Sequence, residues 1–197
     1  MAKRVFDFLG AALALLLLAP LLAAVALWVK LDSPGPVFFR QQRVGRHGVL
    51  FSIHKFRTMR DGAAGLPLTV AADARITRAG AFLRRTRLDE LPQFIDVLQG
   101  TMSLVGPRPE VPRYVAHYPP DLRERALAVR PGITDPASLA FIDEAALLTR
   151  AADPEREYIE VILPRKLQLA ADYAGRASLR TDVVVLWRTL SVLLGRR

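Results

Sequence analysis

Two adjacent carboxylates follow a group of arginines near the middle of the chain. Asp89 and Glu90 come shortly after Arg84, Arg85 and Arg87. A carboxylate can attack phosphorus as a nucleophile or ligate a hard cation such as Mg²⁺, and arginines can hold phosphate oxygens. The group therefore indicates chemistry on a phosphorylated substrate. The alternative is structural, because an Asp-Glu pair at a helix start commonly caps the helix and interacts with its dipole.

Two further basic residues have patterns that suit an anionic ligand. Arg108 lies between Pro107 and Pro109, which fix the backbone and present the guanidinium rigidly to a phosphate or a planar base. Lys55 lies at the end of an expected strand, where it shares a face with Arg57. The alternatives are a turn with an exposed arginine and a solvated basic edge strand.

A short helix over residues 88–100 is predicted to carry the two carboxylates. Its apolar positions repeat at the helical period. They are Leu91, Phe94, Ile95 and Leu98. Pro92 fits the first turn and Gly100 fits the position after the last turn, so Asp89 is the predicted N-cap and Glu90 the first helical residue. The helix dipole and free N–H groups would then favour the ionised carboxylates.

The surrounding chain predicts a mixture of helices and a few short strands. Segments 37–41 and 50–56 read as two strands of a hairpin, and 76–87 reads as a helix. Residues 61–74 read as loop. Residues 182–194 form an apolar helix that could be part of a core or lie at a membrane interface.

Further along, residues 105–112 read as a loop rich in proline and glycine, and 130–136 as a second structured turn. Asp153 and Pro154 mark a helix start, with a cap followed by a proline at the first helical position. The predicted fold class is α+β, mainly helical with a short β-hairpin.

A run of 21 apolar residues, from Leu9 to Val29, precedes all of these elements. About 20 apolar residues are enough to cross a bilayer as a straight helix, so the run predicts membrane insertion. Pro20 lies near its middle and can kink or break the helix. The preceding residue, Ala19, offers no side-chain hydrogen bond to the backbone groups that a break would free.

Basic residues on both sides of the apolar run favour a cytoplasmic location for both flanks. These residues are Lys3, Arg4, Lys30, Arg40, Arg43 and Arg46. A helix that enters the membrane, breaks near Pro20 and returns to the same face would satisfy both flanks. The alternative is an ordinary kinked span. The predicted organisation is a re-entrant membrane helix over residues 1–32 and a cytoplasmic catalytic domain with interfacial helices over residues 33–197.

Composition limits the classes of partner and of chemistry. The chain has 197 residues, a net charge of +9 and no cysteine, which excludes disulfides and thiol chemistry. The three histidines show no metal-binding spacing. Aromatic residues are few and do not alternate with the basic ones as in single-strand binders, so nucleic acid is not an expected partner. With a membrane anchor present, the basic charge favours anionic lipid and phosphorylated ligands.

Six segments of the chain, read together and in order, resemble the bacterial sugar transferases, specifically the small monotopic phosphoglycosyl transferases. The resemblance extends from the N-terminus to about residue 135, and several long motifs in one order are more specific than any single motif. The segments are Lys3–Asp7, the apolar run with its proline, Lys55–Met59, Leu88–Gln93, Met102–Pro109 and Arg130–Thr134.

The resemblance implies an enzyme at the cytoplasmic face of the bacterial inner membrane. Such enzymes transfer a phospho-sugar from a UDP-sugar to a polyprenol phosphate such as undecaprenyl phosphate, release UMP and need Mg²⁺. This transfer is the first membrane step of glycoconjugate synthesis, which includes exopolysaccharide, O-antigen, capsule and glycoprotein. The family's membrane element is a re-entrant helix broken at a Ser-Pro pair, which is Ala19-Pro20 here.

The resemblance also implies roles for individual residues. Asp89 matches the nucleophile that forms a covalent phospho-sugar intermediate, and Glu90 matches the residue that helps to place the metal ion; both are metal-ligand candidates. The implied phosphate-binding residues are Lys55, Arg84 and Arg108. Pro107, Arg108 and Pro109 are implied to lie near the uridine.

The sequence departs from the family pattern after Thr134, where Asp135–Ser138 replaces the usual Gly-Trp-Ala-Gln. The identity of the sugar therefore stays open. The oligomeric state, including a homodimer, is open as well. Two alternatives also stay open. One is direct transfer with Asp89 as a general base, and the other is a non-catalytic basic scaffold at the membrane surface.

Overall fold

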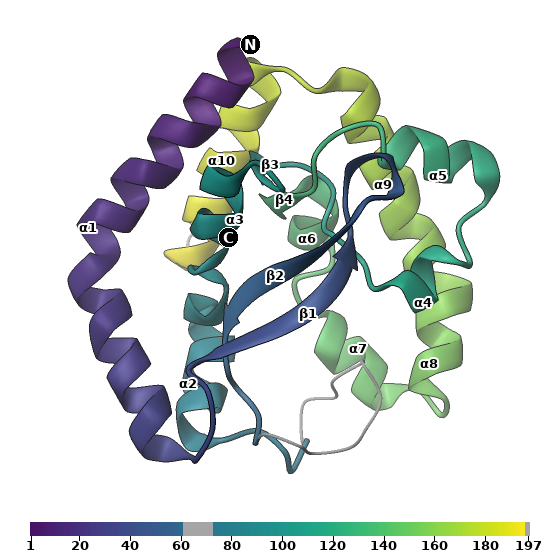
Figure 1. The fold of residues 1–197 in the computed structure, drawn as a ribbon. Helices are drawn as coiled ribbons and strands as arrows, with labels where there is room; N and C mark the ends of the chain where they lie inside the picture. The colour runs from purple at the N-terminus through teal and green to yellow at the C-terminus, as the bar shows by residue number, and fades with distance from the viewer. Residues whose placement is uncertain (61–72, 196–197) are drawn as a thin grey trace.

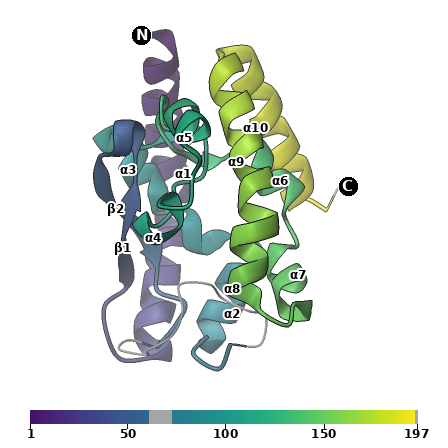
Figure 2. The same cartoon turned by 90° about the vertical axis from the view of Figure 1, so that its right-hand side faces the viewer.

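Helices dominate the computed structural model, which describes residues 1–60 and 73–195 (Figures 1 and 2). The helices are α1 (Ala2–Asp32), α2 (Arg78–Thr86), α3 (Gln93–Gln99), α4 (Pro112–Val115), α5 (Pro120–Ala126), α6 (Pro136–Ala140), α7 (Glu144–Arg150), α8 (Pro154–Glu157), α9 (Leu163–Arg176) and α10 (Leu179–Leu193). The strands are β1 (Phe38–Val44), β2 (Leu50–Phe56), β3 (Ser103–Val105) and β4 (Gly132–Thr134). The predicted α+β class is confirmed, whereas the loop predicted over 61–74 falls mostly outside the described residues.

Helix α1 runs without interruption through Pro20 and bows away from the rest of the chain (Figure 1). A proline removes one backbone donor and clashes with the preceding turn, which bends a helix without ending it. The break expected at Ala19-Pro20 is therefore a bend within one helix. Among the described helices, α1 alone is long and apolar enough to cross a membrane. Most of its surface is exposed, including Leu13, Leu16 and Leu17.

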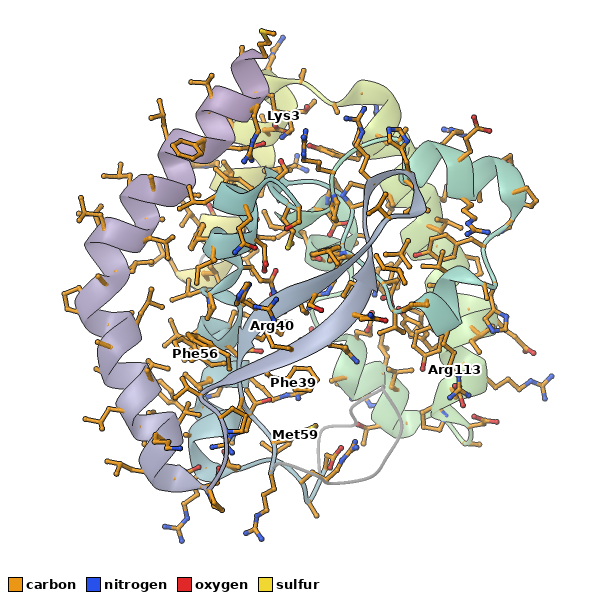
Figure 3. All side chains as sticks on the ribbon, viewed as in Figure 1. Lys3, Phe39, Arg40, Phe56, Met59 and Arg113 are labelled. Atoms are coloured by element: carbon orange, nitrogen blue, oxygen red, sulfur yellow. The ribbon has the colours of Figure 1, made fainter. Side chains whose placement is uncertain are left out.

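Buried polar contacts fasten the N-terminal end of α1 to distant segments. The Asp7 carboxylate accepts hydrogen bonds from Ser103 Oγ at 2.8 Å and from the Leu104 N–H at 3.2 Å. Lys3 Nζ donates to Asp182 Oδ2 in α10 at 2.5 Å. Figure 3 shows Lys3 at this end of the helix. Since Asp7 and Asp182 are both buried, these bonds hold the helix end against β3 and α10.

The C-terminal end of α1 is fastened to the same body by different residues. Asp32 Oδ2 accepts the Ala79 N–H at 3.0 Å. The buried Arg57 guanidinium donates to the carbonyls of Val29 at 3.2 Å and Ser33 at 2.7 Å. Arg57 thus satisfies carbonyls that the helix end leaves without partners. Beside these contacts, Val25 and Val29 pack with Phe56, Ala79 and Leu83, and Figure 3 shows Phe56 on the α1 side of the hairpin.

The antiparallel pair β1–β2 confirms the predicted hairpin, with Phe38 opposite Phe56 and Val44 opposite Leu50. Strand β1 continues to Val44, three residues past its predicted end. The hairpin docks on α3 through His54, whose Nδ1 lies 2.6 Å from Asp96 Oδ1 and whose N–H donates to Asp96 Oδ2 at 2.8 Å. Because successive strand residues face opposite sides, this contact turns Lys55 the other way.

Strands β3 and β4 form a short parallel pair that the sequence did not predict. The residues of β4 lie within the predicted turn over 130–136, and only Val105 of β3 lies within the predicted loop over 105–112. The glycines that follow β3 and open β4 make the close approach possible. A Cβ atom on Gly106 would lie 2.3 Å from the Arg130 carbonyl oxygen, and one on Gly132 would lie 2.1 Å from the Gly106 nitrogen. The pair places the segment after Gly106 beside the start of α6.

The carboxylate pair lies in a tight turn between α2 and α3. Arg87 ends α2 in the left-handed region with φ 60°, and Leu88–Glu90 forms a single 3₁₀ turn. The predicted N-cap role of Asp89 is wrong, because α3 begins only after Pro92, with no side-chain cap. The ring of Pro92 removes an N–H that such a cap would satisfy. The predicted end at Gly100 is confirmed, with φ 86°.

Two predictions about the C-terminal third can also be assessed. The carboxylate of Asp153 caps α8, accepting the N–H groups of Glu155 at 3.1 Å and Arg156 at 3.0 Å, as predicted. Helix α10 packs partly into the core, which was one of its two alternatives, whereas a position at a membrane interface stays a prediction. One face is buried through Asp182 and Val185. The other exposes apolar side chains, which are Val183, Val184, Trp187, Leu190, Leu193 and Leu194.

Candidate active site

Three segments distant in the chain bring their charged side chains together around Glu90. Lys55 Nζ, from β2, donates to Glu90 Oε1 at 2.6 Å. The Arg108 guanidinium, from the loop after β3, donates from Nη1 to Glu90 Oε2 at 3.2 Å and from Nη2 to Glu90 Oε1. Lys55 Nζ also lies 3.9 Å from Asp89 Oδ2. Both carboxylates are largely buried, with 8% of Asp89 and 9% of Glu90 exposed.

The two carboxylates have opposite electrostatic environments. Burial raises the pKa of Asp89, and the nearby Lys55 opposes this only in part. Burial also acts to raise the pKa of Glu90, but Arg108 and Lys55 together hold it well below its ordinary value. Glu90 is therefore firmly ionised, whereas Asp89 is the more basic carboxylate and has the weaker contacts.

Four other arginines that were named with the site candidates separate into two groups. Arg84, in the last turn of α2, interacts electrostatically with Asp89, and burial lowers its pKa. Three other arginines point elsewhere. Arg57 holds the end of α1, Arg85 lies over the Phe82 ring, and Arg87 donates to the Ile142 carbonyl at 3.3 Å. The prediction that Lys55 and Arg57 share a face of one strand is wrong, because β2 ends at Phe56, between the two residues.

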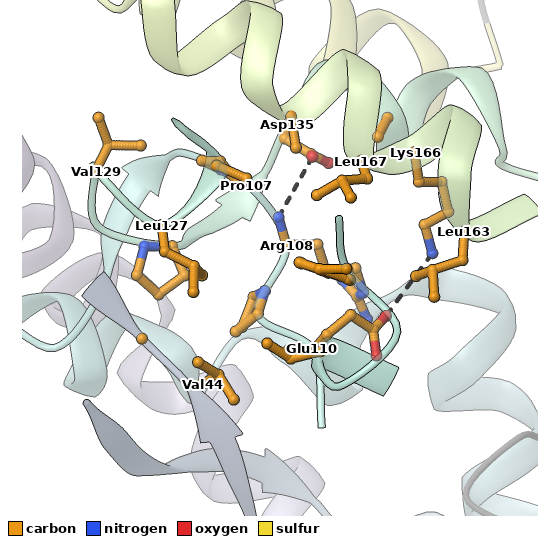
Figure 4. A pocket seen from close by; sticks show the side chains of 18 residues that line it. Val44, Pro107, Arg108, Glu110, Leu127, Val129, Asp135, Leu163, Lys166 and Leu167 are labelled. Atoms are coloured by element: carbon orange, nitrogen blue, oxygen red, sulfur yellow. Dashed lines mark hydrogen bonds and ion pairs between the residues drawn. The ribbon is translucent and has the colours of Figure 1, made fainter. Parts of the chain in front are cut away.

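The loop that carries Arg108 is held in place by backbone contacts on its far side. The Arg108 N–H donates to Asp135 Oδ2 at 3.3 Å, a contact drawn in Figure 4. The other oxygen, Asp135 Oδ1, accepts the Ser138 N–H at 2.8 Å and caps α6. Arg43 Nη1 donates to the Pro109 carbonyl at 3.0 Å. The backbone between Pro107 and Pro109 is therefore held by Asp135, at the start of α6, and by Arg43, from β1. The Arg108 side chain points to Glu90.

A second buried network supports the same loop from behind. Glu110 Oε1 accepts the Tyr158 hydroxyl at 2.6 Å and lies 4.0 Å from Lys166 Nζ. Lys166 in turn donates to Glu144 Oε2 at 2.8 Å. Figure 4 shows Glu110 and Lys166 facing each other across the loop. Arg108 and Glu110, which are two residues apart in this loop, thus face different ways, Arg108 toward the carboxylate pair and Glu110 toward Tyr158 and α9.

Sequence reasoning missed the supporting residues Asp135, Glu110 and Arg43. Asp135 had a readable signal, because an aspartate before a proline is the same cap pattern that was recognised at Asp153. Glu110 and Arg43 had no comparable signal. Their partners are 48 residues away for Glu110, at Tyr158, and 66 residues away for Arg43, at Pro109.

The carboxylates of Asp89 and Glu90 are compatible with a magnesium ion that a phosphorylated substrate helps to bind. No group of three or more His, Cys, Asp or Glu side chains within residues 1–60 and 73–195 could hold a metal ion alone. Mg²⁺ often uses one or two carboxylates and completes its shell with substrate phosphates and water. Asp89 and Glu90 fit that pattern, although the two oxygens of Glu90 are already engaged by Lys55 and Arg108.

An apolar cavity of about 230 Å³ lies beside helix α1. Its walls come from α1, the hairpin and the start of α3. They are Leu22, Ala23, Ala26, Phe38, Phe56, Pro92 and Ile95. Phe56 directly follows Lys55, and Pro92 is two residues past Glu90. The cavity is therefore bounded by the apolar N-terminal helix, the hairpin and the segment that follows the carboxylate pair.

Comparisons with known proteins converge on one family. A family model described as bacterial sugar transferase matches residues 1–196. A UDP-glucose:undecaprenyl-phosphate glucose-1-phosphate transferase from Xanthomonas campestris is 39% identical over the whole chain, which spans 39% of that relative. A transferase with the same description from Caulobacter vibrioides is 39% identical over 98% of the chain and 69% of the relative.

Two further relatives broaden the set. A UDP-N-acetylgalactosamine-undecaprenyl-phosphate N-acetylgalactosaminephosphotransferase from Aeromonas hydrophila is 38% identical over 98% of the chain, with 43% of that relative covered. An exopolysaccharide production protein, PSS, from Rhizobium leguminosarum is 54% identical over 54% of the chain and 54% of the relative. The chain thus spans about half or less of several of the relatives that it matches.

Proposed function

The chain belongs to the bacterial sugar transferase family, and on this basis we propose that it moves a sugar 1-phosphate from a UDP-sugar to undecaprenyl phosphate. UMP is the second product, and the reaction takes place at the cytoplasmic face of the bacterial membrane. The observation that carries the proposal is the buried pair Asp89–Glu90 facing Lys55, Arg84 and Arg108. Three cations at one buried carboxylate pair suit two anionic, phosphorylated substrates.

Asp89 is the proposed nucleophile. In the first half-reaction, an Asp89 oxygen attacks the phosphorus bonded to the sugar. The bond from that phosphorus to the bridging oxygen of the diphosphate breaks, and UMP leaves with that oxygen and the electron pair. Burial raises the pKa of Asp89, which makes its ionised oxygen the more basic attacking group, and Lys55 is its nearest cation at 3.9 Å.

The second half-reaction regenerates the carboxylate. A phosphate oxygen of undecaprenyl phosphate attacks the same phosphorus, and Asp89 leaves with the electrons of the acyl-phosphate bond. Lys55, Arg84 and Arg108 are proposed to hold phosphate oxygens in both steps, where charge accumulates on the transferred group. A magnesium ion at Asp89 and Glu90, when bound, would neutralise part of the charge on the diphosphate.

The attachment of α1 supports a membrane element that enters and leaves on one side. A helix of 31 residues is about 46 Å long, and the bilayer core is about 30 Å thick. Lys3 and Asp7 fasten one end to the rest of the chain, and Asp32 and Arg57 fasten the other. A crossing helix would pull this charged body through the lipid. We therefore propose that α1 lies in one leaflet, with its exposed leucines toward lipid.

Topology can be tested because the chain has no cysteine of its own. Single-cysteine variants Ala2→Cys and Gln42→Cys place one reporter at the first residue of α1 and one after its end. We expect an impermeant maleimide to label neither variant in intact spheroplasts and both in inverted vesicles. Labelling of Ala2→Cys alone in intact spheroplasts would establish a crossing helix.

The apolar cavity supports a lipid acceptor. It is lined by α1, the hairpin and the start of α3, and its wall residues Phe56 and Pro92 lie one and two residues from Lys55 and Glu90 in the sequence, so we place part of the acceptor's hydrocarbon chain there. Its volume of about 230 Å³ is below the usual range of ligand pockets, which begins at about 300 Å³, so it suits part of a chain rather than a whole one.

Release of UMP tests the proposed function. Purified protein with Mg²⁺ and undecaprenyl phosphate would be given a panel of UDP-sugars that includes UDP-glucose and UDP-N-acetylgalactosamine, the donors that the relatives' names suggest. We expect release with at least one donor and none from the Asp89→Asn variant. Release from that variant at the wild-type rate would move the nucleophile elsewhere.

A further inference from the structure

Both oxygens of the Glu90 carboxylate are occupied by side chains of the protein itself. Oε1 receives Lys55 Nζ at 2.6 Å and a nitrogen of Arg108, and Oε2 receives Arg108 Nη1 at 3.2 Å. The side chains are mostly withdrawn from water, with 11% of Glu90, 17% of Lys55 and 28% of Arg108 exposed. A metal ion that needs a Glu90 oxygen must first displace one of these cations.

Charge makes that displacement unfavourable for a metal ion alone. Lys55, Arg84 and Arg108 carry three positive charges against the two negative charges of Asp89 and Glu90, so the group has a net charge of +1. A divalent cation would increase this excess. It would also leave a mostly buried lysine or arginine without an anionic partner, which is costly in a site of low dielectric.

A diphosphate has the opposite effect. Its oxygens can accept the hydrogen bonds of Lys55 and Arg108, because both side chains bind phosphate as well as carboxylate. Each cation then exchanges one anionic partner for another, and the Glu90 oxygens become available to the metal ion. The incoming negative charge also removes the electrostatic penalty for a divalent cation.

We propose that Lys55 and Arg108 form a latch on Glu90 that keeps the metal ion out until the donor diphosphate arrives. The inference rests on the proposed function, since it takes the diphosphate of a UDP-sugar as the ligand that opens the latch. Metal and nucleotide then bind cooperatively. By thermodynamic linkage, the factor by which nucleotide tightens metal binding equals the factor by which metal tightens nucleotide binding.

The exchange needs only side-chain rotation. The Arg108 backbone is held by Asp135 and lies between two prolines, and its neighbour Glu110 is fixed by Tyr158. Lys55 is in a strand whose other face is tied to α3 through His54. The loop and the strand therefore stay in place while the long side chains of Lys55 and Arg108 turn from Glu90 to the phosphates.

Manganese binding tests the latch without any turnover. The electron paramagnetic resonance signal of free Mn²⁺ would be measured with full-length protein in detergent, with and without saturating UDP, after subtraction of the Mn²⁺ that UDP holds in solution. We expect UDP to tighten Mn²⁺ binding by at least about tenfold, within the usual range of coupling between sites. Calorimetry should show Mn²⁺ tightening UDP binding by the same factor.

Variants separate the latch from ordinary metal binding. Arg108→Gln removes one latch cation, so it should strengthen Mn²⁺ binding without nucleotide by about fivefold or more and reduce the coupling. Arg113→Gln is the matched control, since Arg113 is half exposed and pairs with Glu155 away from the site. It should leave both affinities unchanged.

Three results would overturn the latch. They are equal Mn²⁺ affinity with and without UDP, absence of Mn²⁺ binding in both conditions, and weaker nucleotide-free binding in Arg108→Gln. Each of these results contradicts the latch alone. If UDP still binds, the proposed donor site is not contradicted. Absence of UDP binding under every condition would instead contradict the proposed function.

Discussion

Asp135 offers a direct test of how the fold positions Arg108. Its buried carboxylate accepts two backbone N–H groups, from Arg108 at 3.3 Å and from Ser138 at 2.8 Å. In Asp135→Ala, the lost helix cap costs about 1 kcal/mol, and the unsatisfied Arg108 N–H costs about 1–3 kcal/mol. The sum of about 2–4 kcal/mol corresponds to a melting temperature lower by about 4–16 °C for a chain of this size.

The chain contains a matched control for this substitution. Asp153 also precedes a proline and caps a helix, with N–H contacts at 3.1 and 3.0 Å, but it is exposed and has no contact with the Arg108 loop. Asp153→Ala should cost about 1 kcal/mol, or about 2–4 °C. The comparison therefore separates the loss of a cap from the loss of the loop contact.

Activity distinguishes a positioning role for Asp135 from a purely structural one. Asp135→Ala should lower kcat/KM for the donor by about 10- to 100-fold, because a small misplacement of a substrate-binding group has effects of that size. Asp135→Asn, which can still accept one N–H, should be intermediate, and Asp153→Ala should match the wild type. Thermal unfolding in detergent and UMP release would be measured on the same preparations. Equal effects of Asp135→Ala and Asp153→Ala on both measurements would refute the reasoning.

Two further predictions follow from the electrostatics and from the attachment of α1. Attack requires ionised Asp89, and burial raises the pKa of Asp89 above its ordinary value of 3.8. The rate of UMP release in a single turnover should therefore rise with pH through that higher pKa. A rate that is already constant from about pH 4 upward would contradict this. Arg57→Gln removes charged hydrogen bonds to the last carbonyls of α1, so it should destabilise the fold by about 2–3 kcal/mol and lower the melting temperature by about 4–12 °C. The exposed Arg156→Gln control should change the free energy of unfolding by less than about 0.5 kcal/mol, and equal melting temperatures for both variants would exclude the anchoring role of Arg57.

The sequence predicted elements whose signals are local. Periodic apolar residues and Gly100 located α3, and the glycines between two alternating segments located the β1–β2 hairpin. The cap at Asp153 was predicted for the same reason, since the aspartate, the proline and the helix start are contiguous. In these cases the residues that determine the structure lie within a few positions of one another.

The predictions that failed involved either a competing local backbone geometry or contacts between residues far apart in the chain. Asp89 was predicted to cap α3, but the left-handed Arg87 and the ring of Pro92 place it in a 3₁₀ turn instead. Arg57 was expected beside Lys55, but the end of α1 provides it with carbonyl partners 24 and 28 residues away. The β3–β4 pair has too few residues for a periodic signal, and it forms because two glycines permit close backbone contact.

Within the site, the residue types were readable but their pairing was not. Lys55, Glu90 and Arg108 were each selected as a candidate, and the fold brings them into one contact group. In the structure Glu90 contacts both Lys55 and Arg108, and Asp89 has weaker contacts. No local sequence pattern predicts these distances. The same limit applies to Asp135, whose cap was readable but whose contact with the Arg108 N–H was not.

Trapping the covalent intermediate tests the central claim most directly. Wild-type protein would be incubated with Mg²⁺ and a donor that supports UMP release, in the absence of undecaprenyl phosphate, and then analysed by peptide mass spectrometry. The account predicts one equivalent of UMP and a phospho-sugar on Asp89 that disappears when the acceptor is added, with neither in Asp89→Asn. UMP release that occurs only with acceptor present, without any adduct on Asp89, would contradict the account and establish direct transfer.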